Sequence, residues 1–147
     1  MNIFRAKTEH LDQLAGLFDQ YRVFYEMDSD FKACHNYLAE RLEKDQSVIF
    51  AAGSDEGVLI GFTQLYRSFC SVELMPLVYL YDLFVDPGAR RGGVAQALMD
   101  AAKQYARAHG AGRLQLETAI SNTQAQALYE DLGWQKDKEF FTYHLAL

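Results

Sequence analysis

The feature that most constrains the fold is an apolar run over residues 77–85, followed by a short glycine-rich turn and then by a helical pattern. A strand this apolar is typical of a sheet position covered on both faces. The helix predicted from about Gly93 to His109 has one apolar stripe, and Gly110 provides its stop. A buried strand that passes through a tight turn into a helix predicts an α/β domain.

The turn has the composition of an anion-binding site. It reads Asp86-Pro87-Gly88-Ala89-Arg90-Arg91-Gly92-Gly93. The first turn of a helix carries unpaired N–H groups and the positive end of the helix dipole, which attract phosphate. Gly92 and Gly93 let the main chain close on an anion without Cβ clashes. We expect a polyphosphate here; the alternative is a plain connection with solvated arginines.

Two common nucleotide motifs are absent from this turn. Gly88 and Gly93 have the spacing of a P-loop, but Val94 and Ala95 follow in place of the lysine and the hydroxyl residue that bind phosphate and magnesium. The G-x-G-x-x-G fingerprint of dinucleotide-binding folds is also missing. The sequence therefore argues against both of these nucleotide sites.

The rest of the chain alternates between helical and strand periodicity without a linker or repeat. Helices are predicted over about 11–25, 31–42 and 123–132, and strands over 3–6, 47–52, 58–66, 113–118, 134–136 and 140–145. Strands in succession over 47–85 predict an antiparallel meander, and the later helical crossover predicts parallel pairing. We expect one domain over residues 1–147, with a mixed central sheet of about seven strands flanked by four helices.

Composition excludes several classes of protein. The 147 residues are 50% hydrophobic with a net charge of −6, which disfavours nucleic acid and anionic membranes as partners. No apolar run approaches the twenty residues of a membrane-spanning helix, and residues 1–7 lack the apolar core of a secretory signal. Cys34 and Cys70 belong to no metal or redox motif. We expect a cytoplasmic protein without a metal.

Two motifs together resemble those of the GNAT superfamily of N-acetyltransferases. The family's pyrophosphate motif is Arg/Gln-x-x-Gly-x-Gly/Ala, and this chain has Arg90, Gly93 and Ala95 at the defining positions. The family's later motif has an Asn before a helix, a Tyr seven residues on and a Leu-Gly-aromatic ending, here Asn122, Tyr129 and the residues 132–134. The resemblance implies the family's fold over essentially the whole chain, and transfer from acetyl-CoA with coenzyme A as product. Many relatives have Gly where Arg91 stands.

The resemblance also implies a cofactor site. The pantetheine arm would pair with the main chain of Leu83, Phe84 and Val85 as an added strand. The pyrophosphate would lie in the turn and on the first amides of the helix, at Arg90, Arg91, Gly92, Gly93, Val94, Ala95 and Gln96. Strands 77–85 and 113–118 would part to admit the thioester, and the N–H of Leu83 or its neighbour would serve as an oxyanion donor.

Three residues are candidates for the chemistry. Asp82 interrupts the apolar strand, and a buried carboxylate has the raised pKa that suits a base for a protonated amine; the alternative is a structural Asp bonded to loop amides or paired with an arginine. The resemblance implies that Tyr129 protonates the leaving thiolate, although its place on an apolar stripe also fits packing. Asn122 is a helix cap, a pantetheine ligand or both.

The acceptor side is expected at the end of the first helix. Tyr25, Glu26 and Asp28 would suit a cationic amine through cation–π and ionic contacts, or they form a solvated helix end. Similar polyamine acetyltransferases often carry Glu where Tyr81 stands, which weakens a polyamine assignment. We expect direct attack by a primary amine of a small, polyamine-like or protein acceptor, in a monomer or a homodimer. A catalytically silent acyl-CoA-binding sensor is the alternative.

Overall fold

The computed structural model describes all 147 residues, which divide into two compact units over Met1–Leu116 and Glu117–Leu147. The first unit holds five strands and three α-helices, and the second holds one helix. The strands are β1 Asn2–Arg5, β2 Val48–Gly53, β3 Leu59–Cys70, β4 Met75–Val85 and β5 Leu114–Gln115. The α-helices are α1 Leu11–Phe24, α2 Phe31–Glu43, α3 Val94–Ala108 and α4 Thr123–Asp131, with 3₁₀ turns at Thr8–His10 and Pro87–Ala89.

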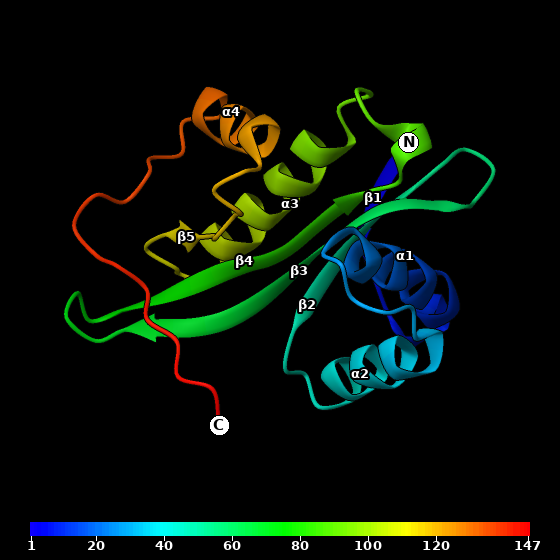
Figure 1. Cartoon of the computed structure of the whole chain (residues 1–147), viewed down its shortest axis with the longest axis horizontal. Helices are drawn as coiled ribbons and strands as arrows, with labels where there is room; N and C mark the ends of the chain where they lie inside the picture. Colours follow the sequence, from blue (N-terminus) through cyan, green and yellow to red (C-terminus); the bar gives the residue numbers. More distant parts are fainter. The chain divides into compact units, whose positions relative to one another are not determined.

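The five strands form one mixed sheet in sequential order (Figure 1). β1 to β4 pair antiparallel as a meander, and β4 pairs parallel with β5 after the α3 crossover. The predicted α/β class and the mixed pairing are confirmed. The β2–β3 hairpin turns through Gly57, whose φ of 80° favours glycine.

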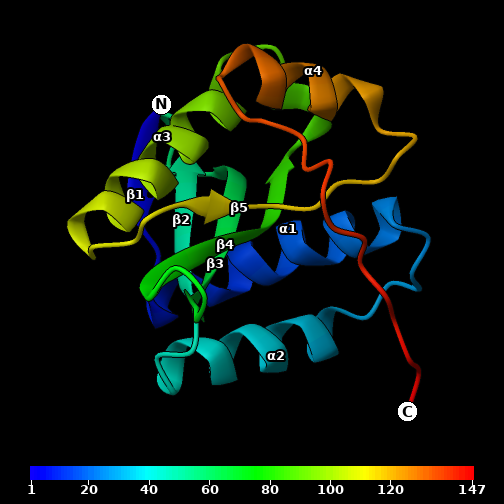
Figure 2. The same ribbon diagram turned by 90° about the vertical axis from the view of Figure 1, so that its left-hand side faces the viewer.

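Helices cover both faces of this sheet, with α1 and α2 on one side and α3 on the other (Figure 2). Neighbouring residues along the strands separate the two cores: Ala51 and Phe84 pack in the cluster with α1 and α2, whereas Ala52 and Val85 pack with α3. This alternation explains why β4 is apolar at nearly every position.

The predicted count of about seven strands is wrong, because residues 134–136 and 140–145 are not strands. The alternating pattern of Phe141, Tyr143 and Leu145 has high strand propensity, but a strand also needs a hydrogen-bonded partner, and these side chains are 85–90% exposed. β5 is also shorter than the predicted 113–118. Its pairing with β4 ends at Gln115.

None of the helices is both long enough and apolar enough to cross a membrane.

Candidate active site

The edge of β4 that faces β5 is open over its C-terminal half. β5 pairs with β4 only at Val78 and Tyr79, whereas β3 pairs with β4 as far as Val85 on the other edge. Residues 80–85 therefore have a neighbour strand on one side only (Figure 1). Pairing between β4 and β5 ends at Tyr79 and Gln115, and an extended ligand can add to the unpaired edge of β4.

The turn after β4 presents uncapped main-chain amides. Asp86 fixes its start, since Asp86 Oδ1 accepts from the Gly88 N–H at 2.8 Å. Its end is different: Gly93 is the N-cap of α3 with φ 78°, and no side chain caps the helix. None of the N–H groups over residues 91–96 donates to a protein acceptor. A row of free main-chain donors at a helix N-terminus fits a diphosphate.

The two arginines of the turn differ in conformation. Arg90 lies across the end of β4, where its Nε donates to the Val85 carbonyl at 3.2 Å and its Cζ lies 5.9 Å from the Phe84 ring centre. Arg91 has φ 64°, a left-handed conformation that usually belongs to glycine. Glycine would adopt this conformation without strain.

Asp82 is a buried carboxylate without a basic partner. It is 6% exposed and forms no salt bridge. Gln64, opposite it on β3, donates from Nε2 to Asp82 Oδ2 at 2.9 Å, and Tyr21 of α1 makes a second side-chain hydrogen bond. Burial raises the pKa of the Asp82 carboxyl, and these two bonds oppose that rise. The alternative of an Asp paired with an arginine does not hold.

A bulge in β4 sets the position of Asp82. Gln64 pairs with Asp82 and Leu65 pairs with Leu80, so Tyr81 is an extra residue on β4. The extra residue points outward while Asp82 turns into the core. On the neighbouring strand β3, Thr63 Oγ1 donates to the Asp82 carbonyl at 2.8 Å and so fixes the main chain at the bulge.

Tyr66 of β3 lies close enough to Asp82 for their charges to interact, and two other tyrosines contact Tyr66. The Tyr66 ring packs edge-on against Tyr81 with centres 5.3 Å apart, and its hydroxyl lies 2.8 Å from that of Tyr37 on α2. Arg41 covers the Tyr37 ring at 4.5 Å. Burial and the bond with Tyr37 raise the pKa of Tyr66, and the nearby Asp82 charge adds to the rise.

Sequence reasoning missed Tyr21 and Gln64. Tyr21 lies three residues after Phe18 on the stripe of α1 that faces the sheet, and its ring packs within 6.0 Å of Phe84 and 5.9 Å of Phe62. The available signal for Gln64 was a lone amide in the apolar run of β3. Neither pattern identifies Asp82 as the shared partner without the strand register.

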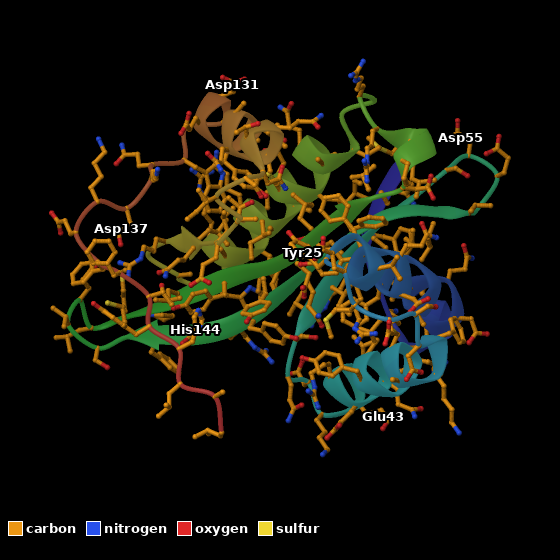
Figure 3. The ribbon with its side chains drawn as sticks, in the orientation of Figure 1. Tyr25, Glu43, Asp55, Asp131, Asp137 and His144 are labelled. Atoms are coloured by element: carbon orange, nitrogen blue, oxygen red, sulfur yellow. The ribbon has the colours of Figure 1, made fainter.

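The predicted acceptor residues lie in the link between α1 and α2, and all three are exposed. Tyr25, labelled in Figure 3, packs edge-on against Tyr21 at 5.1 Å and so lies one ring away from Asp82. Glu26 and Asp28 follow it, with Glu26 at φ 62°. The structure brings Tyr25 toward the carboxylate and leaves the side chains of Glu26 and Asp28 in solvent.

Asp19 holds this link in place. Its Oδ2 accepts from Ser29 Oγ at 2.6 Å, and its Oδ1 accepts from the Asp30 N–H at 2.7 Å. These bonds lower the pKa of the Asp19 carboxyl. Arg22 adds a bond from Nη1 to the Asp28 carbonyl at 3.3 Å.

In the second unit, the two candidate residues stand two turns apart on α4, on nearly the same face. Asn122 caps the helix, since its Oδ1 accepts from the Ala125 N–H at 3.2 Å, and its amide nitrogen donates to no protein atom. Tyr129 is half-buried with its ring 6.2 Å from that of Trp134. The predicted role of Asn122 as a helix cap is therefore confirmed, and its side-chain NH₂ group remains free to donate.

The chain resembles known acetyltransferases along its whole length. The profile of the acetyltransferase (GNAT) family matches residues 11–134. An uncharacterized N-acetyltransferase of Bacillus subtilis, YhfO, is 45% identical over 99% of this chain and 97% of its own. A crystal structure of a probable acetyltransferase shares 43% identity at a TM-score of 0.94, covering 100% of this chain and 98% of the other. An aminoglycoside N-acetyltransferase in complex with CoA is 26% identical at a TM-score of 0.85, covering 99% and 95%.

Proposed function

Because the chain belongs to the GNAT family and is an N-acetyltransferase, we propose that it transfers the acetyl group of acetyl-CoA to a primary amine by direct attack of that amine. The observation that carries this proposal is the row of uncapped amides over residues 91–96, at the end of a strand whose open edge begins beside a buried carboxylate.

The cofactor site follows from the free main-chain groups. When bound, acetyl-CoA supplies an acetyl thioester as the electrophile. The open edge at Leu83, Phe84 and Val85 would hold the pantetheine arm, and the Leu83 N–H would stabilise negative charge on the acetyl oxygen. The turn and the first amides of α3 would hold the diphosphate, with Arg90 and Arg91 as cations. Supporting this, a CoA complex exists for a relative that covers 99% of the chain.

Asp82 is the proposed base. A primary amine has a pKa near 10.4 and is protonated at neutral pH, so it must lose a proton before it attacks. A carboxylate with a raised pKa, next to neutral donors only, can accept that proton directly or through water. Tyr129 is the proposed acid for the thiolate, and the free amide nitrogen of Asn122 is a proposed donor to pantetheine.

The acceptor is proposed to be a cationic, hydroxyl-rich or polyamine-like small molecule rather than a protein amine. The exposed carboxylates of Glu26 and Asp28 follow the exposed ring of Tyr25 in the same link, and this combination of side chains attracts ammonium groups. The aminoglycoside acetyltransferase named above is the relative that motivates this choice.

Three further proposals concern the molecule as a whole. A single acetyltransferase domain over residues 1–147 is supported by a family match that continues past residue 116. A homodimer is supported by exposed aromatic side chains in the last eight residues, Phe140, Phe141 and Tyr143. A cytoplasmic location is consistent with two free cysteines.

The decisive test measures thiol release from acetyl-CoA with a panel of amines that includes aminoglycosides, polyamines and a lysine peptide. We expect turnover with at least one small amine, and we expect Asp82→Asn to lower kcat at least about 100-fold with little change in the KM for acetyl-CoA. Wild-type rates and pH profile in that variant would reject Asp82 as the base. Cofactor binding by calorimetry without turnover on any amine would favour the sensor instead.

A further inference from the structure

We infer that Gln64, supported by Ser47, is a positioning residue that holds the Asp82 side chain in one orientation and favours its ionised form. The inference rests on the proposed role of Asp82 as the base. It adds two residues from outside the family motifs, one on β3 and one just before β2.

The three side chains form a continuous buried chain. Ser47 Oγ donates to Gln64 Oε1 at 2.9 Å, and Gln64 Nε2 donates to Asp82 Oδ2 at 2.9 Å. Ser47 is 2% exposed, Gln64 0% and Asp82 6%. A fully buried polar chain in a sheet core is costly unless every member is paired, so its presence points to a function beyond packing.

The direction of the Gln64 amide follows from the charge of Asp82. An ionised carboxylate only accepts hydrogen bonds, so the NH₂ end of the amide must face it. This leaves the amide oxygen pointing away from Asp82 into the core. The Ser47 hydroxyl supplies the donor that this oxygen needs. If the amide were reversed, two oxygens would meet unless Asp82 carried a proton.

Among the groups around Asp82, Gln64 is the main hydrogen-bond donor that favours the ionised carboxylate. From α1 only Tyr21 reaches the carboxylate, and from β3 Tyr66 lies close enough for its charge to interact. On α2, Tyr37 is bonded to Tyr66 and Arg41 lies over the Tyr37 ring. All donors to the carboxylate are neutral, and a neutral donor stabilises the anion less than an arginine does. Gln64 and Tyr21 thus favour the carboxylate against the effect of burial, without the stronger stabilisation that an arginine would give.

The test measures the titration of Asp82 directly by ¹³C NMR of protein labelled at its aspartate carboxyls, with Asp82→Asn identifying the resonance. In Gln64→Met, which removes the donor and keeps an apolar side chain of similar length, the titration midpoint of Asp82 should rise by about 1 pH unit. Ser47→Ala should raise it in the same direction by less. Ser47→Thr keeps the hydroxyl and is the matched control, with the midpoint of the wild type.

An unchanged Asp82 midpoint in Gln64→Met would overturn the inference. If Gln64→Met does not fold by circular dichroism, Ser47→Ala decides, and an unchanged midpoint there has the same meaning. The result is independent of the amine, so it stands apart from the proposed function. Wild-type turnover in Asp82→Asn would reject the base while leaving the NMR shift intact.

Turnover of the best amine from the panel gives a second readout. The pH midpoint of kcat should move with the NMR midpoint in Gln64→Met, whereas the KM for acetyl-CoA should stay that of the wild type. Adding Gln64→Met to the Asp82→Asn variant should have no further effect on kcat, since Gln64 acts through Asp82. If Gln64→Met lowered kcat in the Asp82→Asn variant by as much as it does in the wild type, Gln64 would have a packing role and the inference would be overturned.

Discussion

At the scale of single residues, the buried Asp82 links activity to stability. Burial raises the pKa of its carboxyl in the folded state above the ordinary value of 3.8. The folded state therefore holds the proton more tightly than the unfolded state. The stabilisation is fully present below about pH 4 and is lost as the pH rises through the folded-state pKa.

This sign makes a prediction for Asp82→Asn, which cannot ionise. The variant should be more stable than the wild type at pH 7, by about 1.4 kcal/mol for each unit by which the pKa is raised, and the difference should vanish near pH 3. Urea unfolding from pH 3 to pH 8 measures it. Equal stability at every pH would mean that the carboxylate is ionised at no cost, against its observed burial.

Arg91 carries a conformational strain that its neighbours do not. A left-handed φ of 64° costs a residue with a Cβ about 1 kcal/mol relative to glycine. Arg91→Gly should raise the free energy of unfolding by up to that amount, less the entropy that glycine gains in the unfolded chain. It should also weaken acetyl-CoA binding by removing a cation. A Tm that falls, at unchanged cofactor affinity, contradicts both parts.

At the scale of elements, Asp19 ties the α1–α2 link to α1 through Ser29 and Asp30. Asp19→Ala should free this link, raising its protease sensitivity and the KM for the amine several-fold, with acetyl-CoA binding unchanged. Because the pKa of Asp19 is lowered in the folded state, the hydrogen bonds of its carboxylate stabilise the protein above pH 4. This stabilisation is lost as the pH falls through the lowered pKa.

The matched control is Asp100→Asn, an exposed carboxylate on α3 without a bonded partner. It should leave both the protease pattern and the KM for the amine unchanged. Equal effects in the two variants would assign the result to the loss of a negative charge rather than to the hydrogen bonds of Asp19.

Apolar periodicity predicts some of the elements of this fold and not others. Four helices and the meander were predictable because apolar residues recur at helical or alternating spacing, as along α3 and β3. The short β5 and the missing C-terminal strands were not, because strand propensity at residues such as Phe141 and Tyr143 does not specify a partner. The bulge at Tyr81 and the contact between Gln64 and Asp82 depend on register, which no single strand encodes.

At the scale of the whole molecule, a ligand that binds only the folded state must stabilise it in proportion to its occupancy. Acetyl-CoA at about a hundred times its Kd should raise the free energy of unfolding by about 2.7 kcal/mol and increase the Tm by several degrees. Inorganic diphosphate should give a smaller rise, since it contacts only the turn and the α3 N-terminus.

The same measurement locates the binding site within the fold. Arg90→Ala removes a cation at the turn and the bond to the Val85 carbonyl, so its Tm should rise much less with acetyl-CoA. Arg107→Ala removes an exposed positive charge from the last turn of the same helix, so its net charge equals that of Arg90→Ala. Its ligand-induced rise should equal that of the wild type, because phosphate at the α3 N-terminus lies about 20 Å away along the helix. Equal losses in the two variants would make the effect one of net charge and would contradict a diphosphate site at the turn.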